Sequence, residues 1–253
     1  MIRSLLLLFF AGFFSAASGQ TIKVMSYNIH HGADKNEVLT LDEMRKYIKD
    51  SGADIVGLQE VDSMCTRSGR VDQMKRLAEI TGMHYAFVRH FAYGGGAYGL
   101  GILSKYPISN VKNNRITILP PNPEKPSLAH LTAEIMLPGK RPLLFSTVHL
   151  SLNTESRLMQ ADEVLAQTAG EIPAIITGDM NANPGTAEIL KLESRFTETG
   201  KNEVFTFPAG KAVKKIDYVM VSKPHLKSVV KSEVHDEVLL SDHLPIISTV
   251  RLK

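Results

Sequence analysis

The sequence contains no tryptophan, only one cysteine and little net charge. Because Cys65 has no second cysteine to pair with, an intramolecular disulfide is excluded and the fold depends on packing. The formal net charge is only +3 over 253 residues. A protein whose main activity is sequence-independent DNA binding usually carries a stronger basic face. A local group of lysines, which is either a solvated loop or a phosphate-facing patch, precedes Asp217: Lys201, Lys211, Lys214 and Lys215.

Several catalytic motifs are also missing. The chain has no HExxH, no pair of CxxC motifs and no His-x-His cluster, which argues against the common zinc sites. It has no G-x-S-x-G elbow, and Ser241, Asp242 and His243 are sequence neighbours rather than an assembled triad, so serine catalysis is not expected. With 43% hydrophobic residues and no repeat after residue 20, the chain is expected to bury one large core or two modest ones.

Residues 1–19 have the form of a signal peptide. Arg3 precedes an apolar block over residues 5–14, and small residues fill positions 15–19. The block is short for a membrane span, although an uncleaved anchor is the alternative. We predict cleavage near Gln20 and a secreted or periplasmic mature protein over residues 20–253. This mature chain is expected to be one domain with no transmembrane segment, and a monomer by default.

Hydrophobic periodicity indicates helices and strands in mixed order. Helices are expected over residues 40–52, 72–80 and 154–168 and after Pro184. Turns at residues 94–96 and 138–140 indicate two antiparallel hairpins, and on the second hairpin His130 falls on the polar side, which is expected to face solvent. Hairpins combined with helical crossovers exclude a purely parallel barrel and favour an α/β (α+β) fold of sheets with helices outside. The remaining strands are expected over residues 21–29, 53–58, 172–176, 216–221 and 246–252.

The stretch TGDMNANP, residues 177–184, carries polar side chains at alternate positions. An EF-hand calcium loop is excluded, because position 6 counted from Asp179 is Pro184 and position 12 is Leu190, where glycine and glutamate are required. Asp, Asn, Pro and Gly are also common turn formers. The stretch is therefore either a plain turn from a strand into a helix or part of an active site.

Short polar clusters stand at the ends of the expected buried strands. Such strand ends often carry binding and catalytic residues on loops held by a rigid scaffold. Taken singly, each of these residues has a structural explanation, as a turn residue, a surface acid or a core histidine. Their joint occurrence at successive strand ends favours one site. The residues concerned are Asn28, Glu60, His149, Asp179, Asn181, Asp217, Asp242 and His243.

Convergence of these carboxylates would be costly without a cation. Two carboxylates about 4 Å apart repel by roughly 4 kcal/mol at an effective dielectric constant near 20. Ligands that are mostly oxygen, with few imidazoles and no thiolate, favour Mg²⁺, Mn²⁺ or Ca²⁺ over Zn²⁺. If the strand ends meet, the sequence therefore predicts a divalent-cation site.

The motifs MSYNIHHG, GLQEVD, GILSKYPI, STVHLS, TGDMNANP, KIDYVMVS and SDHLPI, in this order, together resemble those of the endonuclease/exonuclease/phosphatase superfamily. The resemblance extends over residues 21–252. It implies a four-layer α/β sandwich in which two packed mixed sheets carry helices on the outside. It also implies hydrolysis of a phosphate ester with Mg²⁺, or with Mn²⁺ or Ca²⁺, as cofactor.

The resemblance assigns roles to the residues at the strand ends. Glu60 resembles the principal metal ligand, with Asn28 and Asp242 nearby as ligands or supporting groups. Asp179 resembles the residue that activates or orients the attacking water. The same resemblance places Asn181 and His149 on the phosphate and makes Asp217 the carboxylate that orients His243.

The substrate is less well specified by the motifs, because branches of the superfamily share them and differ in surface loops. A phosphodiester is favoured over a monoester, with nucleic acid or a phospholipid or sugar-phosphate head group as alternatives, and a non-catalytic binding module as the rival class. The segment CTRSGRVDQ, with Arg67 and Arg70, either grips a second phosphate or leads into a helix. No acid in GGAYGLGILSK is evident as a partner for His149, and the loop at 94–96 is expected to be a hairpin tip.

Overall fold

The computed structural model describes residues 20–200 and 204–253. The predicted signal peptide, residues 1–19, and Lys201 lie outside these residues. Within the described part of the chain, no helix combines the length and the apolar character needed to cross a membrane. The secondary structure is mixed, with two six-stranded sheets.

The first sheet is built around a parallel pair of strands. β1 (Thr21–Asn28) runs parallel to β2 (Ile55–Ser63), and the crossover between them contains α1 (Leu41–Ser51). All other neighbours in this sheet are antiparallel. α2 (Gln73–Thr81) follows β2 in the chain. Across the sheet the order is β11 (Leu226–Val234), β12 (Ile246–Leu252), β1, β2, β4 (Gly96–Ser104) and β3 (His84–Tyr93).

The second sheet repeats this plan. β7 (Arg141–His149) runs parallel to β8 (Ala174–Asp179) through a crossover that contains α3 (Thr154–Gln167). α4 (Ala187–Glu193) follows β8. The order across the sheet is β5 (Ile108–Thr117), β6 (Ser127–Leu137), β7, β8, β10 (Asp217–Ser222) and β9 (Phe196–Glu198).

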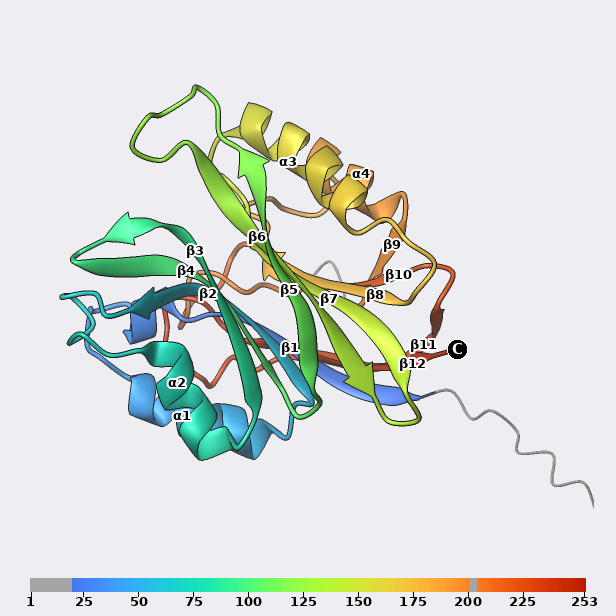
Figure 1. Cartoon of the computed structure of the whole chain (residues 1–253), viewed down its shortest axis with the longest axis horizontal. Helices are drawn as coiled ribbons and strands as arrows, with labels where there is room; N and C mark the ends of the chain where they lie inside the picture. The colour runs from blue at the N-terminus through green and yellow to red at the C-terminus, as the bar shows by residue number, and fades with distance from the viewer. Residues whose placement is uncertain (1–19, 201–203) are drawn as a thin grey trace, which may run out of the picture.

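The two sheets pack face to face and each carries two helices on its outer face, which confirms the predicted four-layer sandwich (Figure 1). The central apolar layer joins both sheets and includes Val24 of β1 and Phe145 of β7. A second layer lies under α1 and α2, where Met44 and Leu77 point inward. A third lies under α3 and α4 and includes Val164. Burial of these apolar faces is the main stabilising contribution to the sandwich.

The prediction that His130 faces solvent is wrong. The side chain is fully buried, and its Nδ1 lies 2.6 Å from Oε1 of Gln167 at the end of α3. The alternation of polar and apolar residues in β6 indicated one wet face. In the sandwich, the end of α3 lies against His130, and Thr132 on the same face is buried beside β5, where its hydroxyl accepts a hydrogen bond from Nδ2 of Asn114 at 2.8 Å.

Three strands have no counterpart in the sequence prediction. β5, β9 and β11 all lie at sheet edges. Because an edge strand leaves many side chains in solvent, it lacks the apolar alternation that reveals a buried strand. The run of exposed residues in β5 and the mixed exposure in β11 show this directly.

A β-bulge interrupts β2 beside the functional residues. Leu58 pairs with Gly101 and Val61 with Gly99, so three steps on β2 face two on β4. The prediction ended this strand at Leu58, whereas it continues to Ser63. Glu60 sits in the bulge with φ 58°, a left-handed conformation that is uncommon for a residue with a side chain. Bulges often re-aim a side chain next to an active site.

Candidate active site

The ends of both parallel strand pairs meet at one edge of the sandwich. In the first sheet Asn28 is paired in register with Gln59, the neighbour of Glu60. In the second sheet His149 is paired with Asp179, which on its other side faces Asp217 of β10. A cleft of about 660 Å³ opens at this edge, and six predicted site residues line it: Glu60, His149, Asp179, Asn181, Asp242 and His243.

Asn28 connects the two sheets behind the cleft. Its Oδ1 accepts the backbone N–H of His30 at 3.0 Å, which fixes the amide so that its nitrogen faces the carboxylates. Nδ2 then donates to Oε1 of Glu60 at 3.0 Å and to Oδ2 of Asp179 at 3.1 Å. In this arrangement Asn28 holds the two carboxylates close together.

Glu60 is set up to remain ionised. Burial alone would raise the pKa of its carboxyl group, but the nearby His149 and the Asn28 hydrogen bond outweigh burial and lower the pKa. A carboxylate that stays charged at the mouth of a cleft is suited to bind a cation.

His243 and Asp217 form a buried pair. Nδ1 of His243 lies 2.9 Å from Oδ2 of Asp217, and Nε2 points toward Asp179, 3.6 Å from its Oδ2. Burial favours the neutral form of both partners and raises the pKa of Asp217. For His243 the same effect is outweighed by Asp217 and then Asp179, and its pKa rises to about 10. We take the ion pair as the stable form, because the direct contact favours opposite charges on the two groups.

Asp179 is surrounded by donors. Its Oδ2 lies 3.4 Å from Nε2 of His149, and its Oδ1 accepts the backbone N–H of Asn181 at 2.9 Å. Asn181 has φ 48° and donates through Nδ2 to the carbonyl of Leu150 at 2.8 Å. The stretch at residues 177–184 is therefore the end of β8 and the turn that follows it, and Asp179, Asn181 and Asn183 line the cleft.

Asp242 and the two arginines occupy different positions relative to the cleft. Asp242 lines it, with Oδ1 3.8 Å from Nδ1 of His30. Arg67 makes a two-point ion pair with Asp62, at 2.8 Å and 2.9 Å, and lines a smaller cavity next to the cleft. Arg70 is exposed and is not among the residues that line either cavity.

Some lining residues carried no signal of their own in the sequence. Arg157 projects from α3 into the cleft wall, where its Nε donates to Glu188 at 2.6 Å. Tyr98 was seen only as part of a hairpin. Lys214, from the group of lysines before Asp217, also lines the cleft. Lys215, from the same group, is instead buried, and its Nζ lies 2.8 Å from Oε1 of Glu198.

Two three-residue groups among the described residues place possible ligand atoms within 4.8 Å of one another. The first group is Asp179, Asp217 and His243. In this group a hydrogen bond already joins Nδ1 of His243 to Oδ2 of Asp217 at 2.9 Å, so these two atoms are not free to bind a metal. The second group is His30, His31 and Glu37. The oxygens of Glu60 and Asp242 in the cleft offer the hard ligands that Mg²⁺ and Ca²⁺ prefer.

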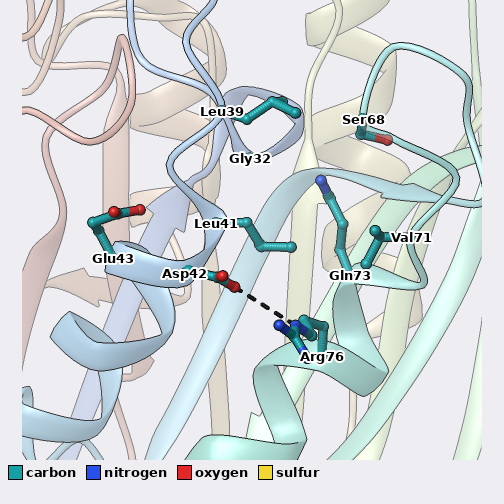
Figure 2. A pocket seen from close by; sticks show the side chains of 9 residues that line it. All are labelled: Gly32, Leu39, Leu41, Asp42, Glu43, Ser68, Val71, Gln73 and Arg76. Carbon is teal, nitrogen blue, oxygen red and sulfur yellow. Dashed lines mark ion pairs between the residues drawn. The ribbon is translucent and has the colours of Figure 1, made fainter.

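A different hollow lies between the starts of α1 and α2. Figure 2 shows this pocket of about 500 Å³, in which Asp42 of α1 faces Arg76 of α2 at 3.6 Å. None of the predicted site residues lines it. Of these two hollows, the cleft at the strand ends is therefore the one lined by predicted site residues.

Comparison with known proteins agrees with this fold. The model of the Endonuclease/Exonuclease/phosphatase family matches residues 25–243. The chain thus belongs to the endonuclease/exonuclease/phosphatase family. Members of this family hydrolyse phosphate esters with a divalent metal, and this chain is a phosphoester hydrolase of that kind.

Individual relatives resemble the chain over nearly its whole length. The protein YbhP of Escherichia coli K12 is 26% identical over 249 residues, which is 92% of this chain and 97% of YbhP. An endonuclease/exonuclease/phosphatase from Bacteroides vulgatus superimposes with a TM-score of 0.75 at 20% identity, over 92% of this chain and all of that one. The human nocturnin catalytic domain, solved with a bound sulfate anion, gives 0.70 at 20% identity, over 92% and 94%.

Proposed function

We propose that the protein is an exported phosphodiesterase that uses Mg²⁺, or a similar divalent ion, to drive in-line attack of water on a phosphate diester. The observation that carries this proposal is the meeting of Glu60, Asp179 and His243 around the amide of Asn28. Export rests on the signal-like form of residues 1–19, and N-terminal sequencing of the protein recovered outside the cytoplasm tests it.

The metal is assigned to the cleft because its donors fit. Glu60, together with Asp242, which lines the same cleft, would hold the ion, and a bound divalent cation would supply positive charge to the phosphate oxygens. Asn28 keeps the Glu60 carboxylate in place from behind. The crowding of carboxylates at the strand ends is what such a cation would offset.

The remaining steps belong to residues of the chain. Asp179, fixed by its surrounding donors, orients the attacking water and accepts its proton. His149 donates an N–H to a phosphate oxygen, and the amide hydrogen of Asn181 that is not bonded to Leu150 does the same. The His243 cation, oriented by Asp217, offsets the negative charge that develops on the phosphate oxygens. As the water oxygen bonds to phosphorus, the ester P–O bond opposite it breaks, and the leaving oxygen takes a proton from solvent.

A diester is favoured by the shape and lining of the cleft. A diester carries an organic group on each side of the phosphorus. Apolar side chains line the cleft beside the charged ones, namely Tyr98, Leu152 and Phe207. The smaller cavity next to Glu60 gives a second organic group a place to bind.

Hydrolysis of bis(p-nitrophenyl) phosphate with and without chelator tests the proposal. We expect turnover that stops with EDTA and returns with Mg²⁺ or Mn²⁺. Asp179→Asn should lower turnover by at least about 100-fold while the fold stays intact, since a positioned base contributes 10²–10⁴-fold. Asp162→Asn, an exposed aspartate paired with Lys191 on the outer helices, is the matched control.

Two outcomes would contradict the proposal. Absence of chelator-sensitive turnover with any of several metals and esters would favour the binding-module alternative. Wild-type turnover in Asp179→Asn would remove Asp179 from the chemistry. A panel of plasmid DNA, RNA, phospholipid and sugar-phosphate substrates then separates the remaining substrate classes.

A further inference from the structure

A smaller cavity adjoins the catalytic cleft and shares a wall with it. The cavity has a volume of about 170 Å³. Glu60 and Tyr98 line both hollows, so a group in the smaller cavity lies next to the proposed metal ligand. Because drug-sized ligands occupy about 300–1,000 Å³, this cavity suits a single ring rather than a whole ligand. We call it the ring subsite; its lining residues are Glu60, Arg67, Phe91, Tyr93, Tyr98 and Lys125.

Three aromatic rings form one wall of the ring subsite. Phe91 and Tyr98 are paired across the β3–β4 hairpin, with ring centroids 5.3 Å apart and planes inclined by 33°. The Tyr93 ring lies 6.5 Å from that of Tyr98 and is 44% exposed. Such rings at a hairpin tip contribute little to the core of the sandwich, whereas they offer apolar contact area to a ligand.

The hairpin tip is held firmly against the loop after β2. The backbone N–H of Thr66 donates to the carbonyl of Gly94 at 2.9 Å, and Sγ of Cys65 donates to the carbonyl of Tyr93 at 3.1 Å. A Cβ at Gly96 would overlap the backbone of Ser63, which shows how closely the two segments pack. The aromatic wall is therefore pre-organised, and little ordering is needed when a ligand binds.

Two cations complete the ring subsite. The guanidinium of Arg67 lies 4.5 Å from the ring centroid of Tyr93, and its Nε and Nη2 bind Asp62. Its Nη1 has no hydrogen-bond partner among the residues in the described ranges. Nζ of Lys125, on the β5–β6 connection, lies 4.8 Å from the Phe91 centroid, and Lys125 makes no ion pair with a described carboxylate.

The charges and aromatic rings of the lining limit the kinds of ligand that fit the ring subsite. A second phosphate is disfavoured, because Asp62 already neutralises Arg67. An aliphatic chain would make no use of the donors of Arg67 and Lys125. A planar ring with oxygen or nitrogen acceptors at its edge fits both the aromatic and the cationic part of the lining. It stacks on aromatic and guanidinium faces, and its acceptors receive hydrogen bonds from the cations.

We propose that the ring subsite binds the base of a nucleotide, so that the diester cleaved in the adjoining cleft is a nucleotide ester. This inference rests on the proposed phosphodiesterase function and names its substrate class. The rings of Tyr93 and Phe91 provide aromatic contact surface, and the Arg67 and Lys125 cations that lie over these rings provide donors for the acceptors of the base. One subsite of this size selects one base next to the scissile phosphate.

Competitive inhibition of bis(p-nitrophenyl) phosphate hydrolysis tests the inference. Thymidine 5′-monophosphate carries a base, which 2-deoxyribose 5-phosphate lacks. A stacked base contributes about 1–3 kcal/mol, so the nucleotide should inhibit the wild type roughly 5- to 150-fold more strongly. Tyr93→Ala should reduce this ratio by about tenfold. Tyr85→Ala, a 45% exposed tyrosine at the other end of β3, should preserve it.

Lys125→Gln provides a second variant on an exposed loop, where the substitution does not disturb the core. It should also lower the ratio. Equal inhibition by the two monophosphates in the wild type would overturn the ring subsite, as would a ratio unchanged in both Tyr93→Ala and Lys125→Gln. These results leave chelator-sensitive hydrolysis intact, whereas its absence would overturn the proposed function itself.

Discussion

Asp217→Asn isolates the electrostatic role of the buried pair with His243. The substitution keeps the shape of the side chain and removes one negative charge that lies 2.9 Å from Nδ1 of the imidazole. At an effective dielectric constant near 20, a charge pair at this separation is worth about 6 kcal/mol, or roughly four pKa units. We therefore expect the pKa of His243 to fall from about 10 to near or below its ordinary value of 6.5.

Stability should follow the same shift. The pKa of His243 is raised on folding, so its contribution is fully present below pH 6.5 and is lost as the pH rises toward about 10. The difference between these two pKa values sets a ceiling of about 5 kcal/mol. Burial of Asp217, which raises the pKa of that carboxyl group, works against this contribution. Between pH 6.5 and 9.5, the wild type should therefore lose more stability than Asp217→Asn.

NMR titration of the histidine ring nitrogens in chelator-treated protein is the direct assay, because a bound cation would add its own charge. The wild-type His243 ring should stay doubly protonated to at least pH 9, and the ring in Asp217→Asn should titrate near or below neutrality. Asp162→Asn should leave it unchanged. A wild-type ring that titrates near 6.5, or a ring unaffected by Asp217→Asn, would refute the ion pair.

Two further predictions concern the scaffold. Gly57→Ala should cost about 1–3 kcal/mol in urea unfolding, because the added methyl overlaps the Thr177 hydroxyl between the sheets, whereas Gly170→Ala, with open space around it, should cost little; equal costs would contradict this packing. Burial lowers the pKa of His130 to about 4, so its contribution is present above pH 6.5 and is lost as the pH falls toward 4. Between pH 7 and 4, His130→Gln should therefore lose up to ~3 kcal/mol less unfolding free energy than the wild type. Identical pH dependence of the unfolding free energy in the variant and the wild type would contradict this prediction.

The buried elements of the fold were predictable from the sequence. β12 has the predicted bounds, and α1 lies between Thr40 and Gly52 as the prediction required. Thr40 shows the limit of such signals, because it stands at the N-cap position while its hydroxyl donates to the carbonyl of Leu240 instead. The edge strands β5, β9 and β11 and the burial of His130 were not predicted, since both depend on what packs against a strand rather than on the strand itself.

The sequence predicted which polar side chains would gather at the strand ends, but it did not predict their geometry. Polar residues at strand ends identified Glu60 and Asp179, yet the bulge that turns Glu60 toward the cleft depends on pairing with β4. The amide of Asn28 as a link between both carboxylates follows from the packing of two sheets, which a linear pattern does not encode. The aromatic wall of the ring subsite likewise arises from hairpin register, which pairs Phe91 with Tyr98.

The central claim is that one divalent ion binds in the cleft on Glu60. A crystal structure of the protein soaked with Mn²⁺, with anomalous data, tests it most directly. The account predicts an anomalous peak within about 2.5 Å of a Glu60 carboxylate oxygen, with the peak lost in Glu60→Gln. A peak found only on His30, His31 and Glu37, or only among Asp179, Asp217 and His243, would contradict it.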